Sequence, residues 1–106
     1  MNEREFGLYP KSLATVRAIL ASEPKVEKAI LYGSRAMGTY KNGSDIDLTL
    51  IGPNLDYGAL AALSGALDDS DIPYMVDLSI LSQIKNPSLV EHIQRVGKVF
   101  YQREEK

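Results

Sequence analysis

Residues 31–50 read LYGSRAMGTYKNGSDIDLTL and place a glycine-serine pair ten residues ahead of two aspartates. The second half of this stretch has the composition of a β-strand, along which side chains alternate between the two faces. Asp45 and Asp47 should therefore share one face, while Ile46 and Leu48 take the other. Two carboxylates so close repel each other unless a cation lies between them. The stretch predicts either a cation site or an edge strand whose exposed face is acidic.

Helical patterns lie on both sides of this stretch. Apolar residues at helical spacing predict helices within residues 11–24, 56–71 and 86–97. Ser12 and Asn86 precede two of these patterns and are the expected N-caps, because their side-chain oxygens can accept the first free backbone N–H groups.

Strand patterns alternate with these helices. Short apolar runs ended by glycine or proline predict strands at residues 29–32, 44–53 and 74–81, and a terminal extended segment at 98–102. This order predicts an α/β (α+β) fold, with helices packed on a small mixed sheet, in a single domain over residues 1–106.

Composition excludes several classes of function. Apolar residues make up 44% and charged residues 25%, as in ordinary globular proteins, and a net charge of −2 gives no general attraction to nucleic acid or anionic membranes. The chain has no cysteine, which excludes disulfides, a thiolate nucleophile and a cysteine zinc site. Neither a signal peptide nor an apolar run near the ~20 residues of a membrane span is evident. We expect a soluble, cytoplasmic protein with no direct contact to nucleic acid or membrane.

A third aspartate lies inside another expected strand. Asp77 has apolar neighbours in YMVDLSI, residues 74–80, where a carboxylate is costly to bury unless it is paired or binds a cation. Together with Asp45 and Asp47 it would form a carboxylate cage suited to Mg²⁺, which prefers hard oxygen ligands and completes its shell with substrate phosphates.

The glycine-serine pair complements these carboxylates. Gly33 ends the first expected strand, and a turn beginning at Ser34 would offer backbone N–H groups and a hydroxyl to phosphate oxygens. Each feature alone has a simpler interpretation: the pair as a plain turn, and Arg35 as a solvated surface residue. The combined spacing of glycine, serine and two aspartates favours a phosphate and metal site.

GSRAMGTYKNGSDIDL, residues 33–48, followed by the aspartate in YMVDLSI, resembles the signature of the DNA polymerase β-like nucleotidyltransferase superfamily. More narrowly, nearly the whole chain is similar to the minimal nucleotidyltransferase (MNT) proteins. The resemblance implies the polymerase β-like nucleotidyltransferase fold. It also implies two residue sets: a nucleotide-binding set of Gly33, Ser34, Arg35 and Ser44, and a catalytic and metal-binding set of Asp45, Asp47 and Asp77.

The resemblance further implies an activity and a partner. Such an enzyme uses ATP with Mg²⁺ or Mn²⁺ in a two-metal mechanism and moves AMP to a hydroxyl acceptor. The MNT proteins resemble antitoxins that act with all-helical HEPN-type proteins, so the implied acceptor is a tyrosine of such a partner in a homo- or hetero-oligomer. Met37 stands where many members carry a basic residue; Arg35 and Lys41 could substitute for it.

Two alternatives remain open at this point. A binding module could keep the fold and mask its partner without chemistry, although it would have no need of three carboxylates and a glycine-serine pair. The acceptor could instead be a small molecule such as an aminoglycoside, bound between two subunits.

Other residues are weaker candidates. We expect His92 on the solvent side of its helix, residues 68–71 as a solvated acidic turn, and the ends as loose segments at residues 1–7 and 103–106. Four tyrosines outside the strand interiors are expected to be packing residues: Tyr9, Tyr40, Tyr57 and Tyr101.

Overall fold

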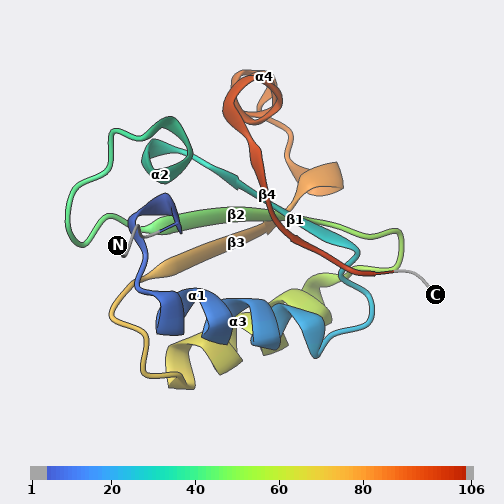
Figure 1. Ribbon diagram of the computed structural model, residues 1–106. Coiled ribbons are helices and arrows are strands. Elements are labelled where there is room, and N and C mark those ends of the chain that lie inside the picture. Colours follow the sequence, from blue (N-terminus) through green and yellow to red (C-terminus); the bar gives the residue numbers. More distant parts are fainter. Residues whose placement is uncertain (1–4, 105–106) are drawn as a thin grey trace.

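The computed structural model describes residues 5–104 as one four-stranded mixed sheet with helices on both faces (Figure 1). Its elements, in chain order, are the 3₁₀ turn η1 (Glu5–Gly7), α1 (Pro10–Ala21), β1 (Lys28–Tyr32), α2 (Ser34–Met37), β2 (Ile46–Ile51), α3 (Tyr57–Asp69), β3 (Val76–Ile80), the 3₁₀ turn η2 (Leu81–Gln83), α4 (Pro87–Val96) and β4 (Lys98–Gln102). The predicted mixed sheet and its packed helices are confirmed.

The sheet has the strand order β3-β2-β1-β4. Strand β1 pairs antiparallel with both β2 and β4, whereas β2 and β3 run parallel. In this register Asp47 lies opposite Tyr32 on one side and Asp77 on the other. Because paired residues of neighbouring strands point to the same face, these three side chains share one face of the sheet.

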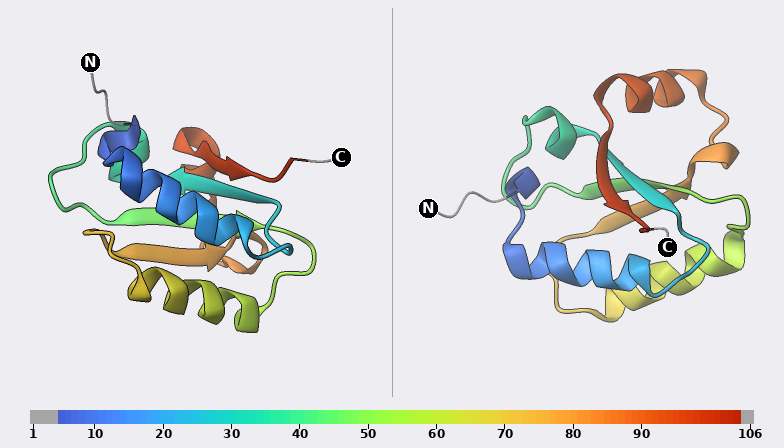
Figure 2. Two further views of the ribbon diagram at one scale, coloured as in Figure 1. Left: turned by 60° about the horizontal axis from the view of Figure 1, so that its bottom comes forward. Right: turned by 45° about the vertical axis from the view of Figure 1, so that its right-hand side comes forward.

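Helices α1 and α3 cover the opposite face, and α2 and α4 lie on the face that carries the aspartates (Figures 1 and 2). The main core fills the space between the sheet and the α1/α3 layer. Its fully buried strand residues include Leu31, Ile46, Leu48 and Leu50, each of which stabilises the fold by about 1.5–3 kcal/mol. Alternation along β2 therefore leaves Asp47 on the face that α1 and α3 do not cover.

Polar side chains cap the first turns of α3 and α4. Asp56 caps α3 by accepting the Ala59 N–H at 2.8 Å, and the predicted Asn86 cap accepts the Ser88 N–H at 2.9 Å. The predicted Ser12 cap is wrong, because α1 begins two residues earlier at Pro10. Proline fixes φ and has no N–H to satisfy, so it suits a first helical position. Ser12 instead lies buried inside the helix.

The third strand is shorter than predicted. It spans Val76–Ile80 rather than residues 74–81, since Leu81 starts the turn η2. Tyr74 precedes the strand and packs against the core, which explains its apolar appearance in the sequence.

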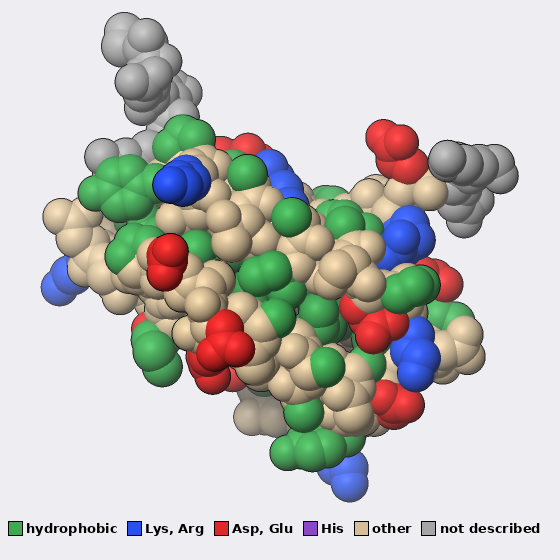
Figure 3. All heavy atoms as spheres, turned by 90° about the horizontal axis from the view of Figure 1, so that it is seen from below, with side chains coloured by type: hydrophobic (Ala, Val, Ile, Leu, Met, Phe, Trp, Pro, Cys, Tyr) green, Lys and Arg blue, Asp and Glu red, His purple; other side chains and the backbone are tan. Residues whose placement is uncertain are grey.

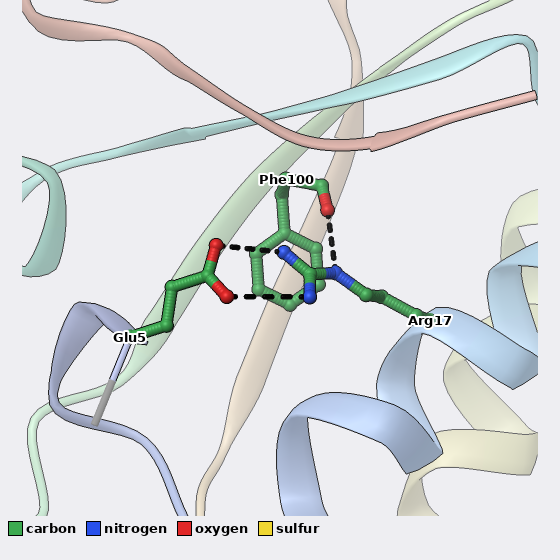
Figure 4. A network of polar contacts seen from close by, with 3 residues as sticks. All are labelled: Glu5, Arg17 and Phe100. Carbon is green, nitrogen blue, oxygen red and sulfur yellow. Dashed lines mark hydrogen bonds and ion pairs between the residues drawn. The ribbon is translucent and has the colours of Figure 1, made fainter. Parts of the chain in front are cut away.

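Both ends of the described chain are anchored, so the predicted looseness is wrong for residues 5–7 and 103. Figure 4 shows Arg17 between Glu5 and Phe100: its Nε donates to the Phe100 carbonyl at 2.8 Å and Nη2 pairs with Glu5 at 3.0 Å. Arg103 donates to the backbone carbonyls of three residues that follow or end α1: Ala21, Glu23 and Val26. Glu104, the last described residue, is exposed, and residues 1–4, 105 and 106 of that prediction lie outside the described residues.

The surface below the sheet is mixed in character. Seen from below in Figure 3, apolar, acidic and basic side chains intersperse. Within residues 5–104, no helix is both long enough and apolar enough to cross a membrane.

Candidate nucleotide and metal site

Gly33 forms a tight turn between β1 and α2. Its φ of 78° and ψ of −157° fall in a region that essentially only glycine adopts, and its carbonyl accepts the N–H groups of Ala36 and Met37 at 3.1 Å. A Cβ at this position would collide with Oδ2 of Asp47. The absence of a side chain therefore lets the turn approach the Asp47 carboxylate.

Asp47 and Asp77 are directly paired across parallel strands. Asp45 is exposed and lies one residue ahead of β2. Burial raises the pKa of Asp47, and the negative charges of Asp77 and Asp45 raise it further. The structure thus brings the three predicted carboxylates into electrostatic contact around Asp47.

These carboxylates fit a cation site whose remaining ligands come from substrate phosphates. In residues 5–104 no three acidic or histidine side chains stand close enough to hold a metal ion unaided, so the expected cage of three carboxylates is not assembled. The physical reason is register: Asp47 and Asp77 pair across the sheet, whereas Asp45 precedes its strand. Mg²⁺ commonly uses one or two carboxylates plus substrate phosphates, and the donor chemistry matches that need.

Tyr32 and His92 complete the surroundings of Asp47. The Tyr32 side chain is only 8% exposed, and burial is the main cause that raises the pKa of its hydroxyl, ahead of the charges of Asp47 and Asp77. The Nε2 atom of His92 accepts the Gly33 N–H at 3.2 Å, and its ring packs edge-on against Tyr32 at 6.2 Å. The prediction that His92 faces solvent is therefore wrong.

Sequence reasoning missed His92, although a signal for it was present. His92 lies three residues after Leu89 and four before Val96, the spacing that puts side chains on one face of a helix. Helix α4 contacts β1, so this spacing indicated that His92 could face the sheet instead of solvent.

Arg35 is a buried residue, 3% exposed, whose side chain makes structural contacts. Its guanidinium donates to the carbonyls of Ser44 and Phe6 at 2.9–3.0 Å and lies between the rings of Tyr40 and Tyr74. The interpretation of Arg35 as a solvated surface residue is wrong. Three of the five guanidinium N–H groups are used in these bonds, and the predicted role of Arg35 in nucleotide binding stays a prediction.

Ser44 belongs to the same structural unit. Its hydroxyl accepts the Lys41 N–H at 2.9 Å and its carbonyl accepts from Arg35, so it shapes the loop that leads into Asp45. Ser34 is the first residue of α2 and partly exposed beside Gly33. Of the four predicted nucleotide-binding residues, Gly33 lies against Asp47 and Ser34 follows it in the chain, whereas Arg35 and Ser44 bond to each other in the loop that leads into Asp45.

The tyrosines expected to pack behave differently from one another. Tyr101 packs on the core and Tyr40 covers Arg35, whereas Tyr57 is 77% exposed at the start of α3 and is no packing residue. Asp68 and Asp69 are exposed as expected, but they belong to the last turn of α3, so the predicted acidic turn at residues 68–71 is wrong for these two.

Comparison with known proteins identifies the family to which this architecture corresponds. Residues 14–106 match the family model for polymerase beta, nucleotidyltransferase. The chain is 38% identical over 75 residues to the probable protein adenylyltransferase MntA of Haemophilus influenzae, a match covering 70% of this chain and 66% of that protein.

Solved structures share the fold. A crystal structure described as a toxin-antitoxin with AMP-PNP superposes with a TM-score of 0.65 at 28% identity, covering 87% of this chain and 74% of the other. A second structure, of a tri-AMPylated HEPN toxin from Shewanella oneidensis in complex with an MNT antitoxin, gives a TM-score of 0.60 at 24% identity over 88% of this chain and 71% of the other. The latter similarity concerns the fold alone.

Proposed function

The chain belongs to the polymerase beta nucleotidyltransferase family, and we propose that it transfers AMP from ATP to a hydroxyl group of a separate protein. The observation that carries this proposal is the pairing of Asp47 with Asp77 on the face opposite α1 and α3, beside the glycine turn at Gly33. A relative that is a probable protein adenylyltransferase supports AMP as the transferred group and a protein as the acceptor.

The proposed partner is a HEPN-type protein, and the proposed acceptor is one of its tyrosines. The resemblance in residues 33–48 and Asp77 motivates this choice, and the similarity to a toxin-antitoxin structure with AMP-PNP supports it. In our proposal the described residues form the nucleotide-binding half of the active site, and the partner brings the hydroxyl to it.

We assign each site residue a role in the transfer of AMP. Asp45, Asp47 and Asp77 would hold one or two divalent cations, Mg²⁺ or Mn²⁺, which when bound neutralise triphosphate charge and lower the pKa of the acceptor hydroxyl. The turn at Gly33 and the Ser34 hydroxyl would receive the terminal phosphates.

The reaction itself is a displacement at phosphorus. The acceptor oxygen forms a bond to the α-phosphorus while the bond to the β-phosphate oxygen breaks, and pyrophosphate leaves. Asp77 is exposed on the edge strand β3, from which it could accept the proton of the incoming hydroxyl. The protein contributes mainly position and charge to this step.

Mass spectrometry tests the proposal directly. The purified chain, ATP and Mg²⁺ are incubated with a co-purified HEPN-type partner, and in parallel with an aminoglycoside. We expect the AMP mass on a partner tyrosine for the wild type and for Asp69→Asn, an exposed acidic control on α3, but not for Asp47→Asn. Equal labelling by Asp47→Asn would refute the assigned site.

The same experiment separates catalysis from masking. A module that only covers its partner would neutralise it without adding mass, and the variant carrying Asp45→Asn and Asp47→Asn would neutralise equally well. Mass on the aminoglycoside alone would replace the protein acceptor with a small molecule.

A further inference from the structure

We infer that His92 is a positioning residue of the nucleotide site, whose imidazole holds the glycine turn against Asp47. The effect of His92 on nucleotide binding rests on the proposed function, whereas the hydrogen bond from which we infer it is part of the fold. The Gly33 N–H donates to Nε2 of His92 at 3.2 Å, in a partly buried setting.

Helix α4 is fixed well enough to position a side chain. Asn86 caps its first turn, and Ile93, the residue after His92, is buried. At its end, a Cβ on Gly97 would collide with the Ile93 carbonyl and crowd Ile30 of β1. The helix is therefore seated closely on β1, and His92 has little freedom to move away from Gly33.

The imidazole contacts both residues of one peptide unit. Its ring packs edge-on against Tyr32, at an interplanar angle of 82°, and its Nε2 atom accepts the N–H of the next residue, Gly33. To accept this hydrogen bond, Nε2 must carry no proton, so the ring is the neutral tautomer with its proton on Nδ1. The peptide that ends β1 is thereby held both by packing and by a hydrogen bond.

This peptide determines how close the turn comes to the carboxylate. Gly33 has a backbone conformation that is unfavourable for other residues, and its Cα lies against Asp47 with no room for a Cβ. Glycine adopts this conformation without steric cost but can also adopt many others, so neighbouring contacts are needed to hold the turn in this one. His92 supplies one of those contacts from α4, and the proposed phosphate site depends on the result.

Two substitutions separate the hydrogen bond from the ring packing. His92→Gln keeps an acceptor at the end of a side chain of similar reach, whereas His92→Phe keeps an aromatic ring against Tyr32 and removes the acceptor. Glu91→Gln serves as a control on the same helix, where Glu91 pairs only with Arg95 in the described residues.

Two measurements are made on each protein. Amide hydrogen exchange at Gly33 in the nucleotide-free protein reports the hydrogen bond, and calorimetric titration with AMP-PNP and Mg²⁺ reports the site. We expect His92→Gln and Glu91→Gln to remain within about threefold of wild type in both, and His92→Phe to exchange faster and bind about tenfold more weakly, the size of one lost hydrogen bond. Melting temperatures identify any variant that does not fold.

The possible results discriminate between explanations. Equal affinities for His92→Phe and wild type, or a loss in His92→Gln that matches or exceeds the loss in His92→Phe, would overturn the inference. If the wild type bound no AMP-PNP, the proposed function would fail, while the exchange rates would still decide whether His92 holds the turn.

Discussion

Replacing Gly33 by alanine tests the geometry of the site most directly. The observed φ of 78° and ψ of −157° cost a non-glycine residue about 1–3 kcal/mol. The new Cβ would also displace Oδ2 of Asp47, and an off-rotamer side chain costs about 0.5–1.5 kcal/mol. Together these effects predict that Gly33→Ala lowers the free energy of unfolding by about 2–4 kcal/mol.

A second glycine provides the matched control. Gly38 has a similar φ of 81°, but with ψ of 9° it lies in the ordinary left-handed region, and a Cβ added there would meet no atom within 4 Å. Gly38→Ala should therefore cost only the left-handed conformation, about 1–2 kcal/mol.

A double-mutant cycle isolates the contact with Asp47. In Asp47→Ala the colliding oxygen is gone, so Gly33→Ala should be less costly in that background by about 1 kcal/mol. The matched cycle of Gly38→Ala with Asp47→Ala should be additive, because those two positions share no contact in the described residues.

Urea unfolding followed by far-ultraviolet circular dichroism measures all of these variants, since the sequence has no tryptophan for fluorescence. If Gly33→Ala costs no more than Gly38→Ala, the backbone assignment is wrong. If Gly33→Ala and Asp47→Ala are additive to within about 0.5 kcal/mol, the turn and the carboxylate do not touch.

Three further predictions concern stability. Because the pKa of Asp47 is raised above the usual 3.8, the folded state binds its proton more tightly than the unfolded state, so the stability of the cation-free protein should fall as pH rises from 3.8 through the raised pKa. Melting temperatures at a series of pH values should show this slope for the wild type and a flatter one for Asp47→Asn. Arg35→Lys should lower the free energy of unfolding by about 2–3 kcal/mol, because lysine cannot replace a guanidinium that bonds the carbonyls of Ser44 and Phe6; an unchanged urea midpoint would contradict this. Asn86→Ala should cost about 1 kcal/mol through loss of the α4 cap, whereas Asn86→Ser should restore most of it, as urea unfolding of the pair would reveal.

The secondary structure was largely predictable because its signals are local. Pro87 and Asn86 mark the start of α4, Gly33 ends β1, and alternation in IDLTLI separates Asp47 from the buried Ile46 and Leu48. Errors arose where two local signals competed, as when Ser12 was preferred as a cap although Pro10 starts the helix.

The sequence singles out the candidate site residues but does not indicate their arrangement. Opposition of Asp47 and Asp77 depends on the parallel pairing of β2 with β3, which no local pattern specifies. Arg35 shows the same limit: its partners are Tyr40, five residues away, and Tyr74, which the fold brings to the other side of its guanidinium. Long-range packing thus places the Arg35 guanidinium against this loop, a contact that no local pattern indicates.

The arrangement around Asp47 also bears on whether the protein is an enzyme or a masking module. In the free protein the carboxylate of Asp47 lies partly buried against the Gly33 turn and in register with a second carboxylate, and both features act against stability. A module that only covers its partner would gain nothing from these features, and neutralising Asp47 should stabilise it without loss of function. An enzyme requires them, because a cation with a triphosphate offsets the repulsion only when both bind. Asp47→Asn should therefore raise the melting temperature of the cation-free protein and abolish AMP transfer, whereas a variant that is stabilised and still labels its partner would contradict the catalytic proposal.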